Sequence, residues 1–438
     1  MSNKKSLLPI CYIEAFERFA FLGFLSIFVF YLIDDFNFSK GDASLISASL
    51  GACIYALGVF GALLSDFCLG SKRSVILGLI MLCIGYFFIF FHSFITLIIG
   101  LIFLVLGSVL IKSNLATLLS KNYTNKNYAF GVFYIFVNIG CFLGQFVLGY
   151  VGQKINYNLA FFIAFLSLLL TIFIYLKNSK YFQNEILNLD YLKQNLKFIF
   201  IFLLGVIIIS TQNLFIISKI ISIFAIVLPF YFYIFIYNKI ENKLNFKILG
   251  VYFLAAIVFY MLIFQSFNTL SILTRQKVVN EIFGFVIPSS WYVSFMFFIS
   301  IFFSILLSKY VKNRNINEAL LFAFAMILAS LAFILAGIFS NYENINAFYI
   351  LIIYFLLGIS QLVVGAIGLS VTSSLSPNKF KTSAIGVWFL CSAAGQGIEG
   401  LIVKLIDSIS LDVYFITQGS FVMLCAILMV IFHKFLKV

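Results

Sequence analysis

Three charged residues stand close together at the start of the first apolar stretch, in the sequence Glu14-Ala-Phe-Glu17-Arg18. Side chains three and four apart share a face of a helix, so both carboxylates and the guanidinium would lie together. A fourth charge, Lys112, lies in the apolar run LVLGSVLIKSNLATLL, more than two helical turns from any other charge. A charge near the centre of a bilayer costs about 2.5–3.5 kcal/mol on insertion scales, so each one requires an explanation.

The chemistry open to these four residues is ion pairing under the control of a proton. A lysine in apolar surroundings needs a carboxylate partner to keep its charge, and Glu14 or Glu17 is the natural one. Protonation of that acid would release Lys112, which could then bind an anionic group of a substrate. The alternative is that the charges reach the membrane interface along their own side chains. It could explain one residue, but it fits a cluster of two acids and a base poorly.

Two further charges, Lys219 and Glu399, also lie inside apolar runs. For both, a functional and a structural interpretation stay open. Lys219 could simply reach for a membrane interface, and Glu399, in GQGIEGLI, could make a single structural hydrogen bond.

Membrane-spanning helices must position these charges. Hydrophobic residues make up 63% of the 438-residue chain and charged residues 10%, far from the composition of a soluble domain. Apolar runs of about 20 residues cross the roughly 30 Å of hydrocarbon as helices, and no alternating barrel pattern is present. We predict an all-α polytopic membrane protein with about fourteen spans, near residues 10–32, 43–64, 75–92, 95–119, 129–150, 157–176, 197–212, 216–237, 248–272, 287–308, 318–340, 347–373, 383–405 and 412–432.

The loops between these spans alternate in charge. Basic pairs such as Lys72/Arg73 and Lys379/Lys381 occur on the side of the N-terminus, and acidic residues such as Asp34, Asp35 and Asp42 on the other. This positive-inside bias explains the net charge of +13 without nucleic acid, and it places both termini in the cytoplasm. The lysine- and asparagine-rich loops are typical of an AT-rich bacterial genome, so we expect a bacterial inner membrane. The spans group into a six-helix bundle (1–176), a linker with two extra spans (177–247) and a second six-helix bundle (248–438), an organisation typical of transporters built from repeats.

Several function classes are disfavoured. The two histidines lie at span ends, most of the seven cysteines lie inside spans, and no cluster of catalytic residues or P-loop motif is present. We therefore expect no enzyme activity, no metal and no cofactor. A membrane sensor and a channel stay open as alternatives from other classes.

Four ordered stretches carry a family resemblance. EAFERFAFLG (14–23) resembles the E-x-x-E-R-F-x-Y-Y-G signature of the proton-dependent oligopeptide transporter family, a branch of the major facilitator superfamily. GVFGALLSDFCLGSKRSVILG (58–78), FYIFVNIGCFLG (133–144) and SPNKFKTSAIGVWFLCSAAGQ (376–396) are similar to its later motifs. The resemblance covers nearly the whole chain and implies the major facilitator fold.

The resemblance also implies roles for individual residues. It assigns Glu14, Glu17, Arg18 and Lys112 to a proton-coupling network, and Asp66, Lys72 and Arg73 to a cytoplasmic gate. It further implies a central cavity. The candidate substrate-binding residues are Tyr55, Asn138, Gln265, Gln361, Trp388 and Glu399. Structural alternatives stay open here, because Tyr55 could be a packed aromatic and Asn138 could bond a neighbouring helix. Gly140 and Gly144 fit helix packing better than a binding site.

Departures from the family pattern bear on the cargo. Leu25, Phe264 and Gln361 stand where charged clamps for the two ends of a peptide are expected, and Met296 replaces a polar residue. We expect a monomeric, proton-coupled symporter that imports di- and tripeptides or peptide-like solutes by alternating access. The alternative keeps the fold and the coupling but carries an amino acid, a carboxylate or a siderophore-like metabolite.

Overall fold

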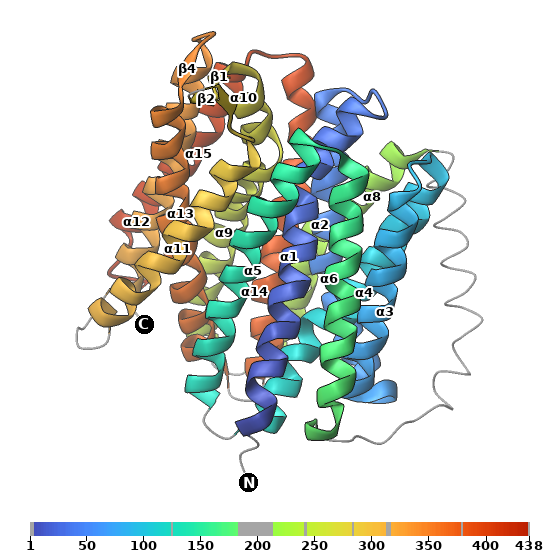
Figure 1. The fold of residues 1–438 in the computed structure, drawn as a ribbon. Coiled ribbons are helices and arrows are strands. Elements are labelled where there is room, and N and C mark those ends of the chain that lie inside the picture. Colours follow the sequence, from blue (N-terminus) through green and yellow to red (C-terminus); the bar gives the residue numbers. More distant parts are fainter. Residues whose placement is uncertain are drawn as a thin grey trace. The chain divides into compact units, whose positions relative to one another are not determined.

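The structure, a computed structural model, describes residues 4–123, 126–182, 213–240, 243–282, 284–311, 317–377 and 380–436, and it is overwhelmingly helical (Figure 1). Twelve helical segments of the described chain are long and apolar enough to cross a membrane, and Ser290–Ser304 is a shorter apolar helix. The predicted span 197–212 lies outside the described residues. The all-α prediction is confirmed, and the count of about fourteen spans is approximate.

The described residues of the first part of the chain form six long helices. They are α1 (Lys4–Asp34), α2 (Lys40–Leu64), α3 (Gly70–Phe90), α4 (Phe94–Asn122), α5 (Lys126–Lys154) and α6 (Tyr157–Asn178). A turn of π-helix, η1 (Ser65–Leu69), joins α2 to α3, and a 3-10 turn, η2 (Ser179–Tyr181), follows α6.

The second part begins with α8 (Leu214–Tyr237) and α9 (Leu244–Ile263). The 3-10 turn η3 (Phe264–Phe267) separates α9 from the short helix α10 (Thr269–Lys277). The remaining helices are α11 (Ser290–Val311), α12 (Glu318–Ser340), α13 (Ala347–Leu375), α14 (Lys381–Ile402) with its 3-10 extension η5 (Val403–Asp407), and α15 (Leu411–Ile431).

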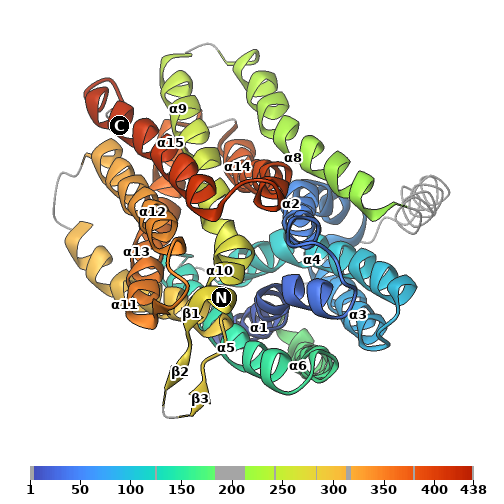
Figure 2. The ribbon, with the colours of Figure 1, turned by 90° about the horizontal axis from the view of Figure 1, so that it is seen from above.

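Four two-residue strands lie at helix ends. β1 (Val278–Val279) pairs in parallel with β4 (Ile345–Asn346), and β2 (Glu281–Ile282) pairs with β3 (Phe285–Val286) in an antiparallel hairpin. The hairpin projects beyond the neighbouring helices in the view of Figure 2. These short ladders satisfy the backbone of loops and contribute no layer of their own.

Packing divides the chain into two compact units. Unit 1 comprises residues 1–31 and 57–217, and unit 2 comprises residues 32–56 and 218–438. The first part of α2 therefore groups with unit 2 and its last part with unit 1, and α8 groups with unit 2. The division into bundles at residues 176 and 247, which the sequence predicts, stays a prediction.

In unit 1, α1 is the central helix and lies among α3, α4, α5 and α6 in Figure 2. In the most apolar 18-residue stretch of α1, 83% of the residues are buried. Phe24 of α1 contacts Tyr86 of α3 and Phe161 of α6 with ring centroids 5.8 and 5.6 Å apart. Many large apolar side chains of the outer helices are exposed, such as Phe173 at 61%, which is typical of a surface that faces lipid. Unit 1 thus encloses the helix that carries the first charge cluster.

Candidate functional site

Glu14, Glu17 and Arg18 form a buried ion cluster on α1. The Arg18 Nε donates a hydrogen bond to Glu14 Oε1 at 2.7 Å and lies 3.1 Å from Glu17 Oε2. The three residues are only 4%, 2% and 8% exposed. Burial this deep indicates that the three charges pack inside the protein, which favours a cluster over simple snorkelling.

Close packing against α5 holds α1 in place beside this cluster. A Cβ built on Gly140 would collide with the backbone of Ala15, and one built on Gly144 would lie 2.8 Å from the Phe19 Cα. A Cβ on Gly23 would in turn lie 2.7 Å from the Gly144 carbonyl oxygen. Only glycine lets the two backbones approach this closely, which confirms the predicted packing role of Gly140 and Gly144.

Lys112 of α4 joins the same cluster. Its Nζ is buried, and it interacts electrostatically with Arg18, Glu17 and Glu14. Tyr86 of α3 and Cys141 of α5 also lie within electrostatic range of Glu17. Helices α1, α3, α4 and α5 therefore surround two acids and two bases whose charges sum to zero when all four are ionised.

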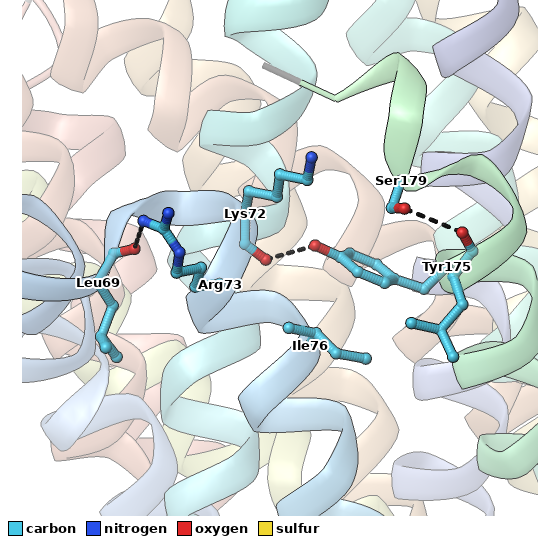
Figure 3. A pocket seen from close by; sticks show the side chains of 7 residues that line it. Leu69, Lys72, Arg73, Ile76, Tyr175 and Ser179 are labelled. Atoms are coloured by element: carbon cyan, nitrogen blue, oxygen red, sulfur yellow. Dashed lines mark hydrogen bonds between the residues drawn. The ribbon is translucent and has the colours of Figure 1, made fainter. Parts of the chain in front are cut away.

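The predicted gating residues and Asn138 also lie in unit 1. Asp66 is exposed on η1, and Lys72 and Arg73 follow in the first turn of α3. The Lys72 Nζ donates to the Phe182 carbonyl oxygen and an Arg73 nitrogen to that of Leu69, each at 3.4 Å; Figure 3 shows the bond of Arg73. Asn138 is buried and donates to the Tyr134 carbonyl oxygen of its own helix at 2.9 Å, which satisfies one of its donors locally.

In unit 2, a helix break brings polar side chains together within a candidate membrane span. The helical span 244–277 is interrupted at Asn268, whose φ of −116° and ψ of −98° are not helical. Gln265 is the centre of the polar contacts. Its Nε2 donates to Met261 O at 3.0 Å and to Gln418 Oε1 at 2.6 Å, while its Oε1 accepts from Thr269 at 2.9 Å and from Tyr414 at 3.0 Å. Interrupted helices with inward polar groups are typical of substrate and ion sites in transporters.

Glu399 of α14 contacts the same break. The Asn268 Nδ2 donates to Glu399 Oε1 at 2.7 Å, and Glu399 has no exposed surface. Within the described residues, Glu399 Oε2, Asn268 Oδ1 and the Ser266 Oγ are buried without a hydrogen-bond partner. Buried polar atoms are normally satisfied, so this cluster has capacity for a further polar group, such as water or a ligand. Lys219, in contrast, is exposed on α8, in keeping with its interfacial interpretation.

Aromatic packing surrounds the other predicted substrate-binding residues. Tyr55 lies edge-on to Phe264, with ring centroids 5.9 Å apart. Trp388 is 2% exposed and contacts Tyr260 and Phe322 with centroids 6.1 and 6.4 Å apart. Trp388 is thus firmly held in the interior of unit 2.

The positions that depart from the family pattern are buried or partly buried. Leu25 is 5% exposed on α1, and Met296 has no exposed surface on α11. The buried Gln361 Oε1 of α13 has no hydrogen-bond partner in the described part of the chain. It is therefore a neutral acceptor available to an N–H group.

An ion-pair network fastens residues 34–42 to the rest of unit 2. Asp34 pairs with Arg275 of α10 at 2.8 Å, and Asp42 pairs with Lys404 of η5 at 2.6 Å. The Ser39 hydroxyl also donates to Asp407 Oδ2 at 2.8 Å. These contacts explain why the first part of α2 groups with unit 2.

Sequence reasoning named Gln265 and Glu399 but missed their partners. Asn268 and Thr269 lie in the polar stretch FQSFNTLS (264–271), inside the predicted span 248–272. This run of polar residues within an apolar span is the sequence feature that could have indicated the helix break. Tyr414 and Gln418 lie about 150 residues further along the chain, and no local pattern points to them.

Comparisons with known proteins agree with this architecture. A model of the POT family matches residues 49–421. Dipeptide and tripeptide permease A of Yersinia pestis is 27% identical over 92% of this chain and 84% of its own, and the uncharacterised transporter YclF of Bacillus subtilis is 26% identical over 95% and 91%. A crystal structure of a peptide transporter POT in complex with sulfate superposes with a TM-score of 0.90 at 21% identity, covering 99% of this chain and 95% of that one.

Proposed function

The chain belongs to the POT family of membrane transporters, and on that premise we propose that it is a proton-coupled symporter that imports di- and tripeptides. Its fold is that of the major facilitator transporters, and family members are transporters, not enzymes. The observation that carries the proposal is the buried cluster of Glu14, Glu17 and Arg18, with Lys112 in electrostatic contact.

The cluster can couple a proton to cargo because its charges balance. With both acids ionised, Lys112 is held by carboxylates. Uptake of one proton by Glu14 or Glu17 leaves a net positive charge, and apolar surroundings make that imbalance costly. An anionic group on the cargo restores the balance by pairing with Lys112. Proton and cargo therefore stabilise each other's binding, which is the requirement for symport.

The driving force is sufficient for uphill transport. One charge moving through 100 mV supplies about 2.3 kcal/mol, which corresponds to roughly 40- to 50-fold accumulation. In the proposed cycle the proton enters from outside, the cargo binds, two bundles rock about the site, and release of both inside restores the pairing between Lys112 and the acids.

In unit 2 we propose that the break around Gln265 and Glu399 receives the polar groups of the cargo. Buried oxygen atoms with spare acceptor capacity suit the amino end and amide N–H groups of a peptide. Gln361 and the aromatic residues Tyr55 and Trp388 complete the proposed lining in unit 2. Asn138 is a separate proposed substrate-binding residue in unit 1.

The orientation belongs to the proposal as well. The positive-inside bias supports cytoplasmic termini in a bacterial inner membrane, with Asp66, Lys72 and Arg73 at a cytoplasmic gate. The transporter works as a monomer in this account, because each chain contributes both the charge cluster and the helix break.

The test is uptake into proteoliposomes with an imposed pH gradient, acidic outside, using a labelled dipeptide. We expect saturable accumulation that needs the gradient and is inhibited by di- and tripeptides but not by single amino acids. Inhibition by an amino acid or a carboxylate alone would favour the alternative cargo. Uptake that is the same with and without the pH gradient would contradict proton coupling. A flux that does not saturate with increasing dipeptide concentration would indicate a channel.

A further inference from the structure

The β2–β3 hairpin at one end of unit 2 exposes apolar side chains. Phe285 and Val286 of β3 are 41% and 44% exposed, and Val279 of the adjoining β1 is 47% exposed. Within residues 281–287 the sequence EIFGFVI has a single charge. The loop 341–344 at the same end of the unit reads NYEN and is polar, as is usual for a loop in water. Contiguous exposed apolar residues indicate a surface that meets something other than water.

The base of the hairpin is held firmly, so its exposed tip has a defined direction. The Ile287 N–H donates to the Asn280 carbonyl oxygen at 2.7 Å and closes the hairpin. The Asn280 side chain donates to the Thr274 carbonyl oxygen of α10 at 3.0 Å and accepts from the Tyr292 hydroxyl of α11 at 2.9 Å. Asn280 is 8% exposed, so water competes little for these bonds. The hairpin is therefore tied to the ends of both helices.

The apolar surface of the hairpin continues into one face of α11. Phe285 contacts Trp291 in the first turn of α11, with ring centroids 5.6 Å apart. Phe298, Phe302 and Leu306 follow Trp291 at intervals of seven, four and four residues, which places them on the same face of the helix. They are 49%, 57% and 47% exposed. In a membrane protein such a stripe faces lipid, so the hairpin adjoins a lipid-facing surface.

We propose that the hairpin lies in the interfacial region of the phospholipid bilayer, with Phe285 and Val286 at the boundary between head groups and acyl chains. Figure 2 looks along the helices, and in this view the hairpin extends sideways past the ends of α10 and α11. Because helices that cross a bilayer run across its plane, a sideways extension at their ends runs along the membrane surface. Interfacial segments bury their apolar faces about 5–10 Å into this boundary.

Two features limit the depth of the hairpin. A two-stranded hairpin has open edges, and its outward N–H and C=O groups need water or head groups as partners, which the hydrocarbon core does not supply. The carboxylate of Glu281, an exposed residue opposite Val286, likewise requires polar surroundings. Trp291, at the root of the hairpin, is of a residue type enriched at membrane interfaces. The interface therefore suits the hairpin better than either water or the hydrocarbon core, and its anchoring would fix the level of the ends of α10 and α11.

Tryptophan fluorescence tests this placement independently of transport. The chain has two tryptophans, Trp291 and Trp388. Trp291→Phe leaves only Trp388, which is 2% exposed and gives a constant background. In this background, Phe285→Trp places a probe on the hairpin, and Asn344→Trp places the matched control on the exposed polar loop. Each protein is placed in nanodiscs that hold a single chain, where water reaches both membrane faces. The quenchers are iodide in the buffer and phosphatidylcholine brominated either near the head-group end or near the methyl end of its acyl chains.

We expect the Phe285→Trp probe to lose most emission to lipid brominated near the head-group end, less to lipid brominated near the methyl end, and little to iodide. The Asn344→Trp control should show the reverse, with loss to iodide and little to either lipid. Iodide quenching of the hairpin probe equal to that of the control would place the hairpin in water and overturn the proposal. Protection from both kinds of quencher would show that protein covers it, which also overturns the proposal. Melting temperatures show whether each variant folds.

Discussion

Arg18 contacts two carboxylates at once, and this arrangement distinguishes the roles of the two acids. Glu14 holds the shorter bond to Arg18 at 2.7 Å, whereas Glu17 is the more deeply buried and interacts with Lys112, Arg18 and Glu14. Protonation of either acid adds the same single charge, but it is favoured at the acid that is more deeply buried and holds the longer contact to Arg18. Glu17 is therefore our candidate for the proton acceptor.

Glu17→Gln should uncouple transport from the proton. A glutamine mimics the protonated acid, so exchange of labelled for unlabelled peptide across the membrane should persist. Accumulation driven by a pH gradient should fall to near equilibrium. Counterflow and gradient-driven uptake measured on the same proteoliposomes check this, and a wild-type pH dependence in the variant would refute the role of Glu17.

Glu399 offers a second test at the residue scale. A structural hydrogen bond to Asn268 and a role in cargo binding predict different effects of substitution. Glu399→Leu leaves the buried Asn268 Nδ2 without its acceptor, which should destabilise the protein by about 1–3 kcal/mol. Glu399→Gln keeps an acceptor oxygen and should retain the melting temperature. If Glu399 binds cargo, the glutamine variant will raise the KM for peptide several-fold; an unchanged KM would leave Glu399 with only its structural hydrogen bond.

The sequence predicts the charged residues well and their partners less well. Glu14, Glu17, Arg18 and Lys112 stand out because a charge is conspicuous in an apolar run. The connection from Lys112 to α1 depends on how α4 packs. The sequence predicts it only because a lysine in an apolar run needs a carboxylate partner, and the family resemblance implies the same pairing. The break at Asn268 was missed because the region around it contains no glycine or proline, so no strong breaker marks it.

At the scale of elements, the α1–α5 contact positions the charge cluster. Gly140→Val would force the two helices apart, because its side chain would collide with the Ala15 backbone. Overpacking of this kind typically costs about 1–3 kcal/mol, so we expect a lower melting temperature and weak uptake. Gly131→Val is the matched control on the same helix, since no atom of the described structure lies within 4 Å of a Cβ built there. Equal effects of both variants would contradict this packing role.

At the scale of the whole molecule, rocking of the two predicted bundles (1–176 and 248–438) would require residues 34–42 to part from α10 and η5 during each cycle. A disulfide formed in Ser39→Cys/Asp407→Cys would prevent that separation, because these side chains are hydrogen-bonded at 2.8 Å. We expect oxidation to stop uptake and a reductant to restore it. The two single variants are the controls. Full uptake by the oxidised double variant would show that this ion-pair region does not open during transport.

The sequence does not predict that the first part of α2 packs with unit 2. The charge alternation and apolar runs indicated most spans, but they assign α2 wholly to the first bundle. The pairs Asp34–Arg275 and Asp42–Lys404 join residues far apart in the chain, and they bring the first part of α2 into unit 2. Such pairings depend on tertiary packing, which no local pattern reports.

The most direct test of the coupling scheme is the accumulation ratio of a labelled dipeptide in proteoliposomes that contain Lys112→Ala, compared with wild type under the same inward proton gradient. For one proton per peptide, each pH unit supports up to about tenfold accumulation by the wild type. The account predicts that Lys112→Ala reaches only equilibrium, with an internal concentration equal to the external one. Uphill uptake by a well-folded Lys112→Ala variant would contradict the claim that this lysine links the proton to the cargo.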